Sequence, residues 1–345
     1  MSARVAAAVD RRAVGEARER LAGLATPPGA LGRLGEAAVW LSGVQGTCPP
    51  RPPSDVRVVV LAGDHGVAQH GVTAFPSSVT PLMVRAFVDG TAGVSSLARQ
   101  HGAQVRVVDV SVDDDLAGLP AEVTAGKVVR GSRPIHLEDA VSPQACEQAL
   151  ALGARLADEA IDDGADLLIG GDMGIGNTTP SAALIAASLG MAAEQVVGRG
   201  TGVDDEGLAR KQDVIDRALR RVGDRADDPL VRLAALGGAD LAAHTAFLAR
   251  AAERGVPVLL DGVISVACAL VAEDLQPGCV AWFAAGHRSP EPAQTLALDK
   301  LGLQPLLDVG MRLGEGSGAV AALPLLRSAA VLLSEVALLA DVLGS

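Results

Sequence analysis

The sequence contains very few aromatic residues: tyrosine is absent, and Phe, Trp and Tyr together make up 2% of the 345 residues. Basic residues are also in the minority, since 29 Lys and Arg stand against 41 Asp and Glu, which gives a net charge of −12. Proteins that bind nucleic acids need a basic surface and usually aromatic rings on which bases stack. The composition therefore argues against nucleic acid as a partner.

Cysteine is scarce too, and the four cysteines are widely scattered. Cys48, Cys146, Cys268 and Cys279 form no CxxC pair and have no histidine at metal-ligand spacing. We expect them to be reduced, structural thiols and expect no metal site.

Long uninterrupted hydrophobic runs are missing as well. The two most apolar stretches, Val256–Ala272 and Ala319–Leu343, are both interrupted by charged residues, and the N-terminus lacks the apolar segment of a signal peptide. We therefore expect a cytoplasmic protein that does not enter a membrane.

The chain is nevertheless rich in hydrophobic residues and glycine. Hydrophobic residues make up 49% of it, which suits a substantial core and excludes intrinsic disorder. The length suits one large domain or two ordinary ones. Glycine occurs 40 times, whereas lysine occurs only at Lys127, Lys211 and Lys300. Because lysine is so rare, each one is a candidate for a specific task.

From residue 56 onward, short aliphatic runs alternate with longer Ala- and Leu-rich segments such as Pro143–Asp162 and Leu233–Arg254. Continuous apolar strands that alternate with helices are typical of a parallel sheet covered on both faces. The sequence predicts an α/β fold with a Rossmann-like, mostly parallel sheet of about six strands. The six predicted strands are Val56–Leu61, Val105–Val110, Asp166–Ile169, Pro257–Leu260, Val280–Ala284 and Pro305–Asp308.

Both ends of the chain are predicted to be helical. Residues 1–46 are rich in Ala, Arg and Glu with a break at Pro27-Pro28-Gly29, and the segment from Gly318 onward has no strand-like run. The Pro-rich segment Cys48–Pro53 marks a boundary. We predict a small helical domain built from residues 1–50 and 319–345, and a large α/β substrate-binding domain built from residues 51–318.

Ligands of such sheets bind beyond the carboxyl ends of the strands, and the residues predicted there are unusual. Asp64 and His65 follow the first strand, where they either form and pack a turn or contact a ligand; both interpretations stay open. After the third strand, Gly170–Pro180 contains four glycines and Asn-Thr-Thr. Thr179 before Pro180 predicts a capped helix start, whose free amides bind anions. This pattern favours a phosphate or ribose site over a plain glycine turn.

Two further Ser/Thr-Pro pairs repeat this pattern. Ser289 precedes Pro290 and Thr80 precedes Pro81, each near a glycine-bearing strand end. Each pair predicts a capped helix start, and together they indicate a shared anion-binding rim.

The last candidates come from two glycine-rich loops. Val197–Val203 leads into a helix with Lys211, which is either a solvated residue or, as its rarity favours, a ligand contact. Glu315 lies between Gly314 and Gly316 just before the final helices. It could merely interact with a helix dipole, but we expect the glycines to leave its carboxylate accessible, as a general base requires.

These motifs together resemble the nicotinate-nucleotide–dimethylbenzimidazole phosphoribosyltransferase family over essentially the whole chain. The resemblance rests on the segment from Pro27 to Leu34, Asp64-His65-Gly66, the loop from Gly174 to Thr179, Leu259–Gly262 and Arg312–Gly318. It implies a homodimer that transfers phosphoribose from nicotinate mononucleotide to 5,6-dimethylbenzimidazole, with inversion at the anomeric carbon. The products are α-ribazole 5′-phosphate and nicotinate, in cobalamin biosynthesis.

The resemblance also implies roles for individual residues. Glu315 is the expected base, and no metal or cofactor is expected, because the pyridinium of the nucleotide is already a cationic leaving group. The resemblance implies that Asp172 and Lys211 help to position the nucleotide. Asp172 stands where the family usually has Glu. The phosphate and ribose are expected to be held by Gly174, Gly176, Asn177, Thr178, Thr179, Gly202 and Ser289. The benzimidazole pocket is expected to be lined by Phe75, Met83 and Leu313.

Three other classes fit the sequence less well. A dinucleotide-dependent oxidoreductase would have GxGxxG after the first strand, where this chain has Ala-Gly-Asp-His-Gly-Val. A diphosphate-dependent phosphoribosyltransferase would show an acidic pair and a threonine-glycine loop after a strand, together with bound magnesium. A non-enzymatic binding protein would not need a glycine-flanked Glu together with several anion loops, although fold alone does not decide this.

Overall fold

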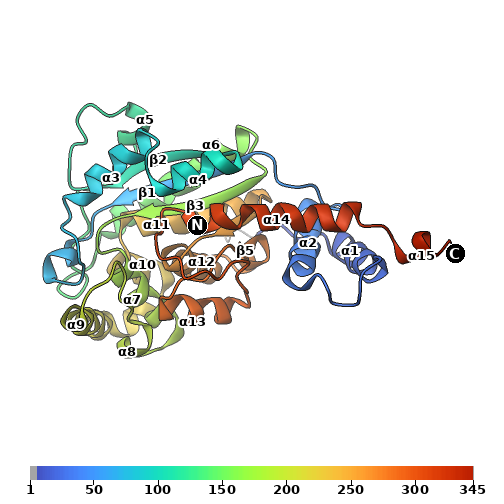
Figure 1. The fold of residues 1–345 in the computed structure, drawn as a ribbon. Helices are drawn as coiled ribbons and strands as arrows, with labels where there is room; N and C mark the ends of the chain where they lie inside the picture. The colour runs from blue at the N-terminus through green and yellow to red at the C-terminus, as the bar shows by residue number, and fades with distance from the viewer. Residues whose placement is uncertain (1–5, 345) are drawn as a thin grey trace.

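The computed structural model describes residues 6–344 and contains a five-stranded parallel sheet (Figure 1). The strands lie in the order β2-β1-β3-β4-β5. Their bounds are β1 Val56–Gly63, β2 Ala103–Ser111, β3 Leu167–Met173, β4 Val258–Leu260 and β5 Phe283–Ala285. The predicted α/β fold with a parallel sheet is confirmed, because the β-branched and aliphatic runs do form buried strands.

The last two predicted strands differ from the structure. Residues Cys279–Trp282 form a 3-10 helix (η3), and only the following three residues enter the sheet as β5. The predicted strand Pro305–Asp308 is not a strand of the sheet. Leu307 instead makes an isolated parallel bridge to His287, and the backbone hydrogen bonds there are confined to Leu306 and Leu307 on one side and residues 285–288 on the other.

Helices cover both faces of the sheet, as predicted. Their bounds are α3 Val79–Val88, α4 Gly93–His101, α5 Ala121–Thr124, α6 Pro143–Asp162, α7 Thr178–Leu189, α8 Ala193–Val196, α9 Asp205–Val222, α10 Pro229–Leu236, α11 Ala239–Arg254, α12 Val263–Leu275, α13 Pro292–Leu301 and α14 Ser317–Glu335. Short 3-10 helices span Gly66–His70 (η1) and Gly223–Asp227 (η2). Helices α3, α4 and the start of α14 lie on one face, and α11 and α12 on the other, with α6 packed along α11 (Figure 1).

Helix α6 has the predicted bounds, whereas the predicted helix Leu233–Arg254 is divided in two. Helix α10 ends at Leu236, and α11 begins at Ala239 after a Gly-Gly pair. Gly238 has φ 151°, a conformation that other residues rarely adopt. This break places Asp240 in the first turn of α11, beneath the sheet.

The predicted Ser/Thr-Pro caps are wrong in all three helices. Helix α3 begins at Val79, α7 begins at Thr178 after the N-cap residue Asn177, and α13 begins at Pro292 after Glu291. Pro81 and Pro180 lie in the first turns of α3 and α7, where proline is tolerated because those amides have no partner in the helix, whereas Pro290 lies before the N-cap residue of α13. Ser/Thr-Pro therefore does not fix the first residue, and Thr80, Thr179 and Ser289 are left for other contacts.

The two ends of the chain pack together, as predicted, through α1 (Arg11–Gly23), α2 (Gly32–Gln45) and α14, and the short helix α15 (Leu339–Leu343) follows α14 (Figure 1). Leu24 pairs with Leu338 in an antiparallel bridge, and the Arg20 guanidinium donates to the carbonyl of Leu333. Helix α14 is long and apolar enough to cross a membrane, but 56% of its most apolar stretch is buried inside the protein. Its apolar side chains pack within the fold, running from the sheet to the terminal helices.

Candidate active site

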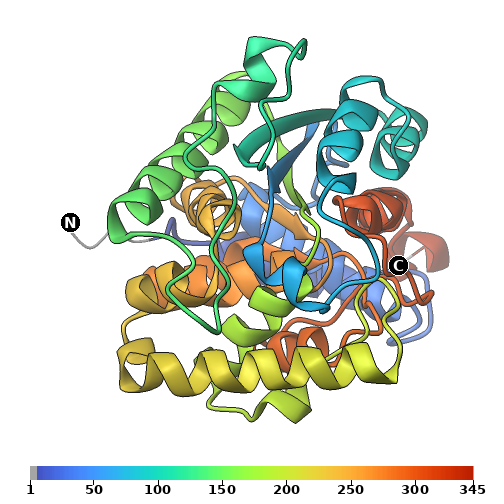
Figure 2. The ribbon, with the colours of Figure 1, turned by 90° about the vertical axis from the view of Figure 1, so that its left-hand side faces the viewer.

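The strand order reverses direction between β1 and β3, and this is where open α/β sheets bind ligands. Asp64 and His65 follow β1 here, Asp172 belongs to β3 and Asp261 follows β4. Helix α9 lies across this side of the molecule in Figure 2. The carboxyl ends of three strands therefore bring four titratable side chains to one edge.

Glu315 reaches this edge from the segment before α14. Its Oε2 accepts hydrogen bonds from the amide of Val94 (3.1 Å) and the hydroxyl of Ser317 (3.5 Å). Contrary to the prediction, the flanking glycines do not leave the side chain open, since the residue is only 4% exposed. Burial raises the pKa of the Glu315 carboxyl, which makes it a better proton acceptor once ionised. A carboxylate in this state has the chemistry of a general base.

Asp261 holds the backbone around Glu315 in place. Its two carboxylate oxygens accept the amides of Gly316 and Ala319, both at 3.0 Å, and so hold the N-terminus of α14. Burial by itself would raise the pKa of Asp261. His287, whose Nε2 lies 3.5 Å from Oδ1, and the two amides outweigh the effect of burial, and the pKa of Asp261 is lowered. Asp261 is therefore an ionised support for α14.

Asp172 is buried at the end of β3. Its Oδ1 accepts a hydrogen bond from the Asn177 side-chain amide at 2.8 Å. Burial and the nearby charge of Asp240 raise the pKa of Asp172 well above its usual range. Asp172 and Asn177, both predicted site residues, are thus in direct contact.

A second buried pair lies beside Asp172. His65 Nε2 lies 2.8 Å from Oδ2 of Asp240 in the first turn of α11. Burial disfavours protonation of His65, but the Asp240 carboxylate outweighs burial and raises the His65 pKa. His65 is therefore held by Asp240, and Asp64 accepts the amide of Asp113 at 2.9 Å.

Lys211 lies inside the protein at the start of α7. It is 1% exposed, and its Nζ donates to Thr178 Oγ1 at 3.0 Å. Burial lowers the pKa of Lys211, while the nearby Glu291 opposes this change. The interpretation as a solvated helix residue is wrong. The ammonium and the start of α7 form a cationic corner suited to a phosphate.

The glycine-rich loop before α9 closes over this corner. Glu291 Oε1 accepts the amide of Gly200 at 2.7 Å, and the Arg312 guanidinium donates to the Gly200 carbonyl at 3.2 Å. Gly202 has φ 111° and faces Arg312. The loop thus connects Lys211 to the segment that bears Glu315.

The other predicted site residues lie around this edge. Gly174 packs so closely on Gly63 that a Cβ would lie 1.9 Å from the Gly63 carbonyl oxygen, and Gly176 has φ 93°. Ser289 is buried and donates its hydroxyl to Gln294 Oε1 at 2.5 Å. Thr179 is fully buried inside α7.

The three apolar candidates lie on different segments. Phe75 (49% exposed) precedes α3, Met83 is partly buried on α3, and Leu313 (54% exposed) contacts the region of Gly93. Phe75 and Leu313 therefore have apolar surface free for a ligand.

Sequence reasoning missed several polar residues of the site: Asp240, His244, Ser265, Glu291 and Gln294. Each has apolar residues or prolines among its near neighbours, and a polar residue in that setting ordinarily indicates nothing more than packing. The one available signal was the four-residue spacing of Asp240 and His244, which places them on the same face of α11.

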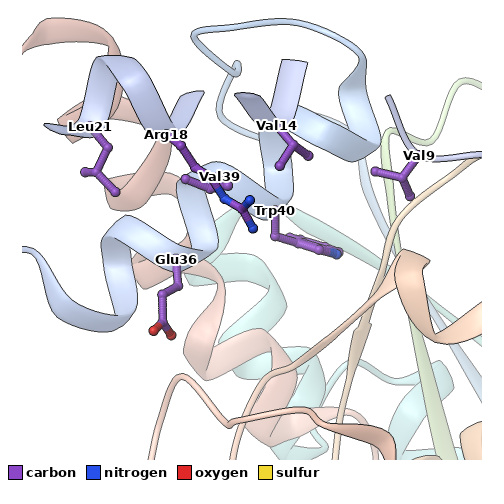
Figure 3. A pocket seen from close by; sticks show the side chains of 7 residues that line it. All are labelled: Val9, Val14, Arg18, Leu21, Glu36, Val39 and Trp40. Atoms are coloured by element: carbon purple, nitrogen blue, oxygen red, sulfur yellow. The ribbon is translucent and has the colours of Figure 1, made fainter. Parts of the chain in front are cut away.

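An apolar hollow of about 400 Å³ lies away from this edge, on the terminal helices α1 and α2 (Figure 3). It is lined by Val9, Val14, Arg18, Leu21, Glu36, Val39 and Trp40. None of the predicted site residues lies in its lining.

A buried carboxylate beside a cationic corner, at the switch point of a parallel sheet, fits the phosphoribosyltransferase class. A family model described as phosphoribosyltransferase matches residues 6–342. The chain belongs to the nicotinate-nucleotide–dimethylbenzimidazole phosphoribosyltransferase family.

Relatives and solved structures of that name match over nearly the whole chain. The enzyme of Mycobacterium avium (strain 104) is 50% identical, covering 96% of this chain and 95% of that protein. The enzyme of Corynebacterium efficiens is 47% identical, covering 96% and 89%. The crystal structure of the enzyme from Thermus thermophilus superposes with a TM-score of 0.91 at 41% identity, covering 97% of this chain and 99% of that chain.

Proposed function

We propose that this enzyme transfers the phosphoribosyl group of nicotinate mononucleotide to 5,6-dimethylbenzimidazole, in cobalamin biosynthesis. The products are α-ribazole 5′-phosphate and nicotinate. The names of its relatives support this reaction. The observation in the structure that supports it most is the buried Glu315 carboxyl with its raised pKa.

Glu315 is the base in this proposal. The lone pair of one benzimidazole nitrogen attacks C1′ of the ribose, and the C1′–N bond to the pyridinium breaks with its electron pair passing to that ring nitrogen. The configuration at C1′ inverts. The proton on the other benzimidazole nitrogen passes to the Glu315 carboxylate, so no positive charge accumulates on the product.

The nucleotide lies at the cationic corner in this proposal. Lys211 binds the phosphate together with the start of α7, where an anion is favoured by the helix dipole. Asp172 holds the nucleotide from the other side, supported by Asn177. The remaining proposed contacts are Gly174, Gly176, Thr178, Thr179, Gly202 and Ser289. Phe75, Met83 and Leu313 pack against the aromatic ring of the acceptor, because their apolar surface favours it over a charged base.

We further propose a cytoplasmic homodimer whose terminal helices form a separate small domain, residues 1–50 and 319–345, beside a large domain of residues 51–318. The hollow on α1 and α2 supports an interface there, because its lining is mostly apolar (Figure 3). The small-molecule substrates need no nucleic-acid or membrane partner.

A product assay tests the reaction. The purified enzyme is given nicotinate mononucleotide with 5,6-dimethylbenzimidazole, other benzimidazoles or purines, and nicotinate release is followed by chromatography. We expect release with 5,6-dimethylbenzimidazole and a new product with the mass of α-ribazole 5′-phosphate. Absence of release with every acceptor would overturn the proposal.

A further inference from the structure

A small cavity lies where β3 and β4 separate. In the described chain these strands form one registered pair, Leu168 with Val258, although β3 continues to Met173 and β4 to Leu260. The space beyond that pair is lined by Gly170, Asp172, His244, Asp261, Gly262, Ile264, Ser265, Gly314 and Glu315. Its volume of about 10 Å³ admits one sphere the size of a water molecule.

Three side chains that line this cavity have buried polar atoms without a hydrogen-bond partner. They are Asp172 through Oδ2, Ser265 through Oγ, and His244 through both ring nitrogens. Buried polar groups in native proteins are nearly always bonded, and an unbonded group costs stability. Three such groups around one cavity therefore point to a shared polar occupant.

The fold makes specific room for His244. A Cβ on Gly170 would lie 2.2 Å from His244 Nε2, so only glycine at this position of β3 lets the imidazole approach the strand. The neighbouring Gly171 makes room on the opposite face of the strand, where a Cβ would lie 2.3 Å from the carbonyl oxygen of Glu315. The Gly-Gly pair thus accommodates His244 on one face and the backbone of Glu315 on the other.

The chemistry of these atoms selects water over an ion. Among residues 6–344, no group of three or more His, Cys, Asp or Glu side chains is arranged to hold a metal ion. Burial lowers the pKa of His244 to about 4, so its ring is neutral near pH 7 and offers one donor and one acceptor. Water offers two donors and two acceptors and satisfies Asp172 whether that carboxyl is ionised or protonated.

We propose that this cavity binds one water molecule held by Asp172, Ser265 and His244, and that His244 acts through it as a positioning residue for Asp172. The Asp172 carboxyl is then fixed at both oxygens, by Asn177 at Oδ1 and by the water at Oδ2. The effect on catalysis rests on the proposed function, in which Asp172 holds nicotinate mononucleotide.

A high-resolution crystal structure of the unmodified enzyme tests the water directly. We expect one density peak within hydrogen-bond distance of Asp172 Oδ2, Ser265 Oγ and a ring nitrogen of His244. The peak is expected to disappear in His244→Leu, whose side chain offers no polar partner. Ordered side chains without a peak between them would overturn the proposal, whatever reaction the enzyme catalyses.

Kinetics test the positioning role. Ser265→Ala and His244→Leu are each expected to raise the KM for nicotinate mononucleotide, by roughly threefold and tenfold, as loss of one buried hydrogen bond implies. The KM for dimethylbenzimidazole should stay unchanged, and His244→Gln should recover most of the effect because it keeps an N–H donor. Thr245→Val, fully buried on the same helix but outside the cavity lining, is the control and should match the unmodified enzyme.

The crystal structure and the kinetic measurements together distinguish a failure of this proposal from a failure of the proposed function. If His244→Leu lowers kcat alone or raises both KM values equally, His244 has a merely structural role and the positioning proposal fails. If the unmodified enzyme releases no nicotinate, the proposed function fails, and the crystal structure still decides whether the water is bound. Ser265→Ala is a small change, which keeps the test decisive even if His244→Leu does not fold.

Discussion

Glu315 has φ 66°, a left-handed conformation that residues other than glycine seldom adopt. Gly314 and Gly316 beside it have φ 79° and 92°, so three successive residues share this conformation. Backbone strain of this kind persists only where the surrounding structure enforces it, and it is concentrated at functional sites. Here the enforcing contacts are the amides bound by Asp261 and the glycine at position 171.

Glu315→Gln is expected to keep the fold and nucleotide binding while kcat falls by at least about a hundredfold, the usual contribution of a general base. The glutamine fills the same space but accepts no proton. Nicotinate release and calorimetric titration with nicotinate mononucleotide measure the two effects. Glu335→Gln, exposed at the far end of α14, is the matched control.

The pH dependence of the unmodified enzyme gives an independent check on Glu315. Burial raises the pKa of this carboxyl, so the proposed base is protonated at mildly acidic pH and cannot accept a proton there. We therefore expect kcat to rise as the pH increases, with a midpoint above the ordinary carboxyl pKa of 4.5. A midpoint at or below 4.5 would contradict a buried base. The proposal would also be contradicted if the residual activity of Glu315→Gln had the same pH dependence as the unmodified enzyme.

Lys211→Met is expected to raise the KM for nicotinate mononucleotide by roughly tenfold or more, since a charge-assisted contact to phosphate is lost. Methionine is chosen because Lys211 is buried, and a shorter side chain would leave a void. Lys300→Met, exposed at the end of α13, is the control. Equal kinetics in the two variants would remove Lys211 from the phosphate site.

At the scale of single residues, sequence reasoning finds groups that break a local pattern. Glu315 between glycines and Lys211 among many arginines both stand out, and the structure buries both near the strand ends. His244 and Ser265 do not stand out, because one polar residue in an apolar helix has no distinctive neighbours in the sequence. Their shared cavity depends on the separation of β3 from β4, which only the folded sheet reveals.

At the scale of elements, β3 serves both faces of the sheet through its two glycines. A strand ordinarily has β-branched residues at such positions, and glycine weakens it. Because these two residues have no side chain, α11 and the segment before α14 approach the backbone of β3 closely from opposite sides. Strand β3 therefore positions both His244 and the backbone of Glu315 in the candidate site.

Gly171→Ala is expected to displace the backbone of Glu315 and to lower both kcat and stability, the latter by about 1–3 kcal/mol as in other overpacked cores. The physical reason is the 2.3 Å distance between the added Cβ and the Glu315 carbonyl oxygen. Activity assays and urea denaturation measure the two effects. Gly15→Ala, on α1 with open space around it, should leave activity unchanged and stability equal or higher. Full activity in Gly171→Ala would show that Glu315 tolerates a shifted backbone.

Most elements are predictable from the sequence, whereas their ends and interruptions are not. The strands follow from aliphatic runs, and α6 follows from the Ala- and Leu-rich segment Pro143–Asp162. Two Ser/Thr-Pro pairs misled because Pro81 and Pro180 lie later in a first helical turn, where proline is also allowed, and the pair Ser289-Pro290 misled because its helix begins only at Pro292. The end of α10 at Gly237-Gly238 was missed because the flanking segments share one helical pattern.

At the scale of the whole molecule, the acidic net charge does not prevent the binding of a small anion. The cationic corner is local: one buried ammonium and one helix start lie within a chain of charge −12. The phosphate of the proposed substrate would meet only this local charge, whereas a nucleic acid polymer would meet the repulsion of the entire surface.

The proposed homodimer makes a prediction at this scale. Light scattering after size exclusion is expected to give twice the chain mass of 34.8 kDa, about 70 kDa. Val39→Glu places a charge in the hollow on α1 and α2 and is expected to yield monomers with unchanged circular dichroism. Leu137→Glu, at an exposed position outside the hollow, is the control. A monomeric unmodified enzyme would contradict the dimer, and a dimeric Val39→Glu would place its interface elsewhere.

The packing of α14 against α1 and α2 also determines the order in which the enzyme is completed during its synthesis. The ribosome synthesises α1 and α2 well before their partner α14. These two helices must therefore wait, with apolar surface uncovered, until the strands between them and α14 have been made. Glu315, the base in the proposed reaction, emerges just ahead of that same helix. Nascent chains that end before this point therefore leave α1 and α2 without their partner helix and also lack the base of the proposed reaction.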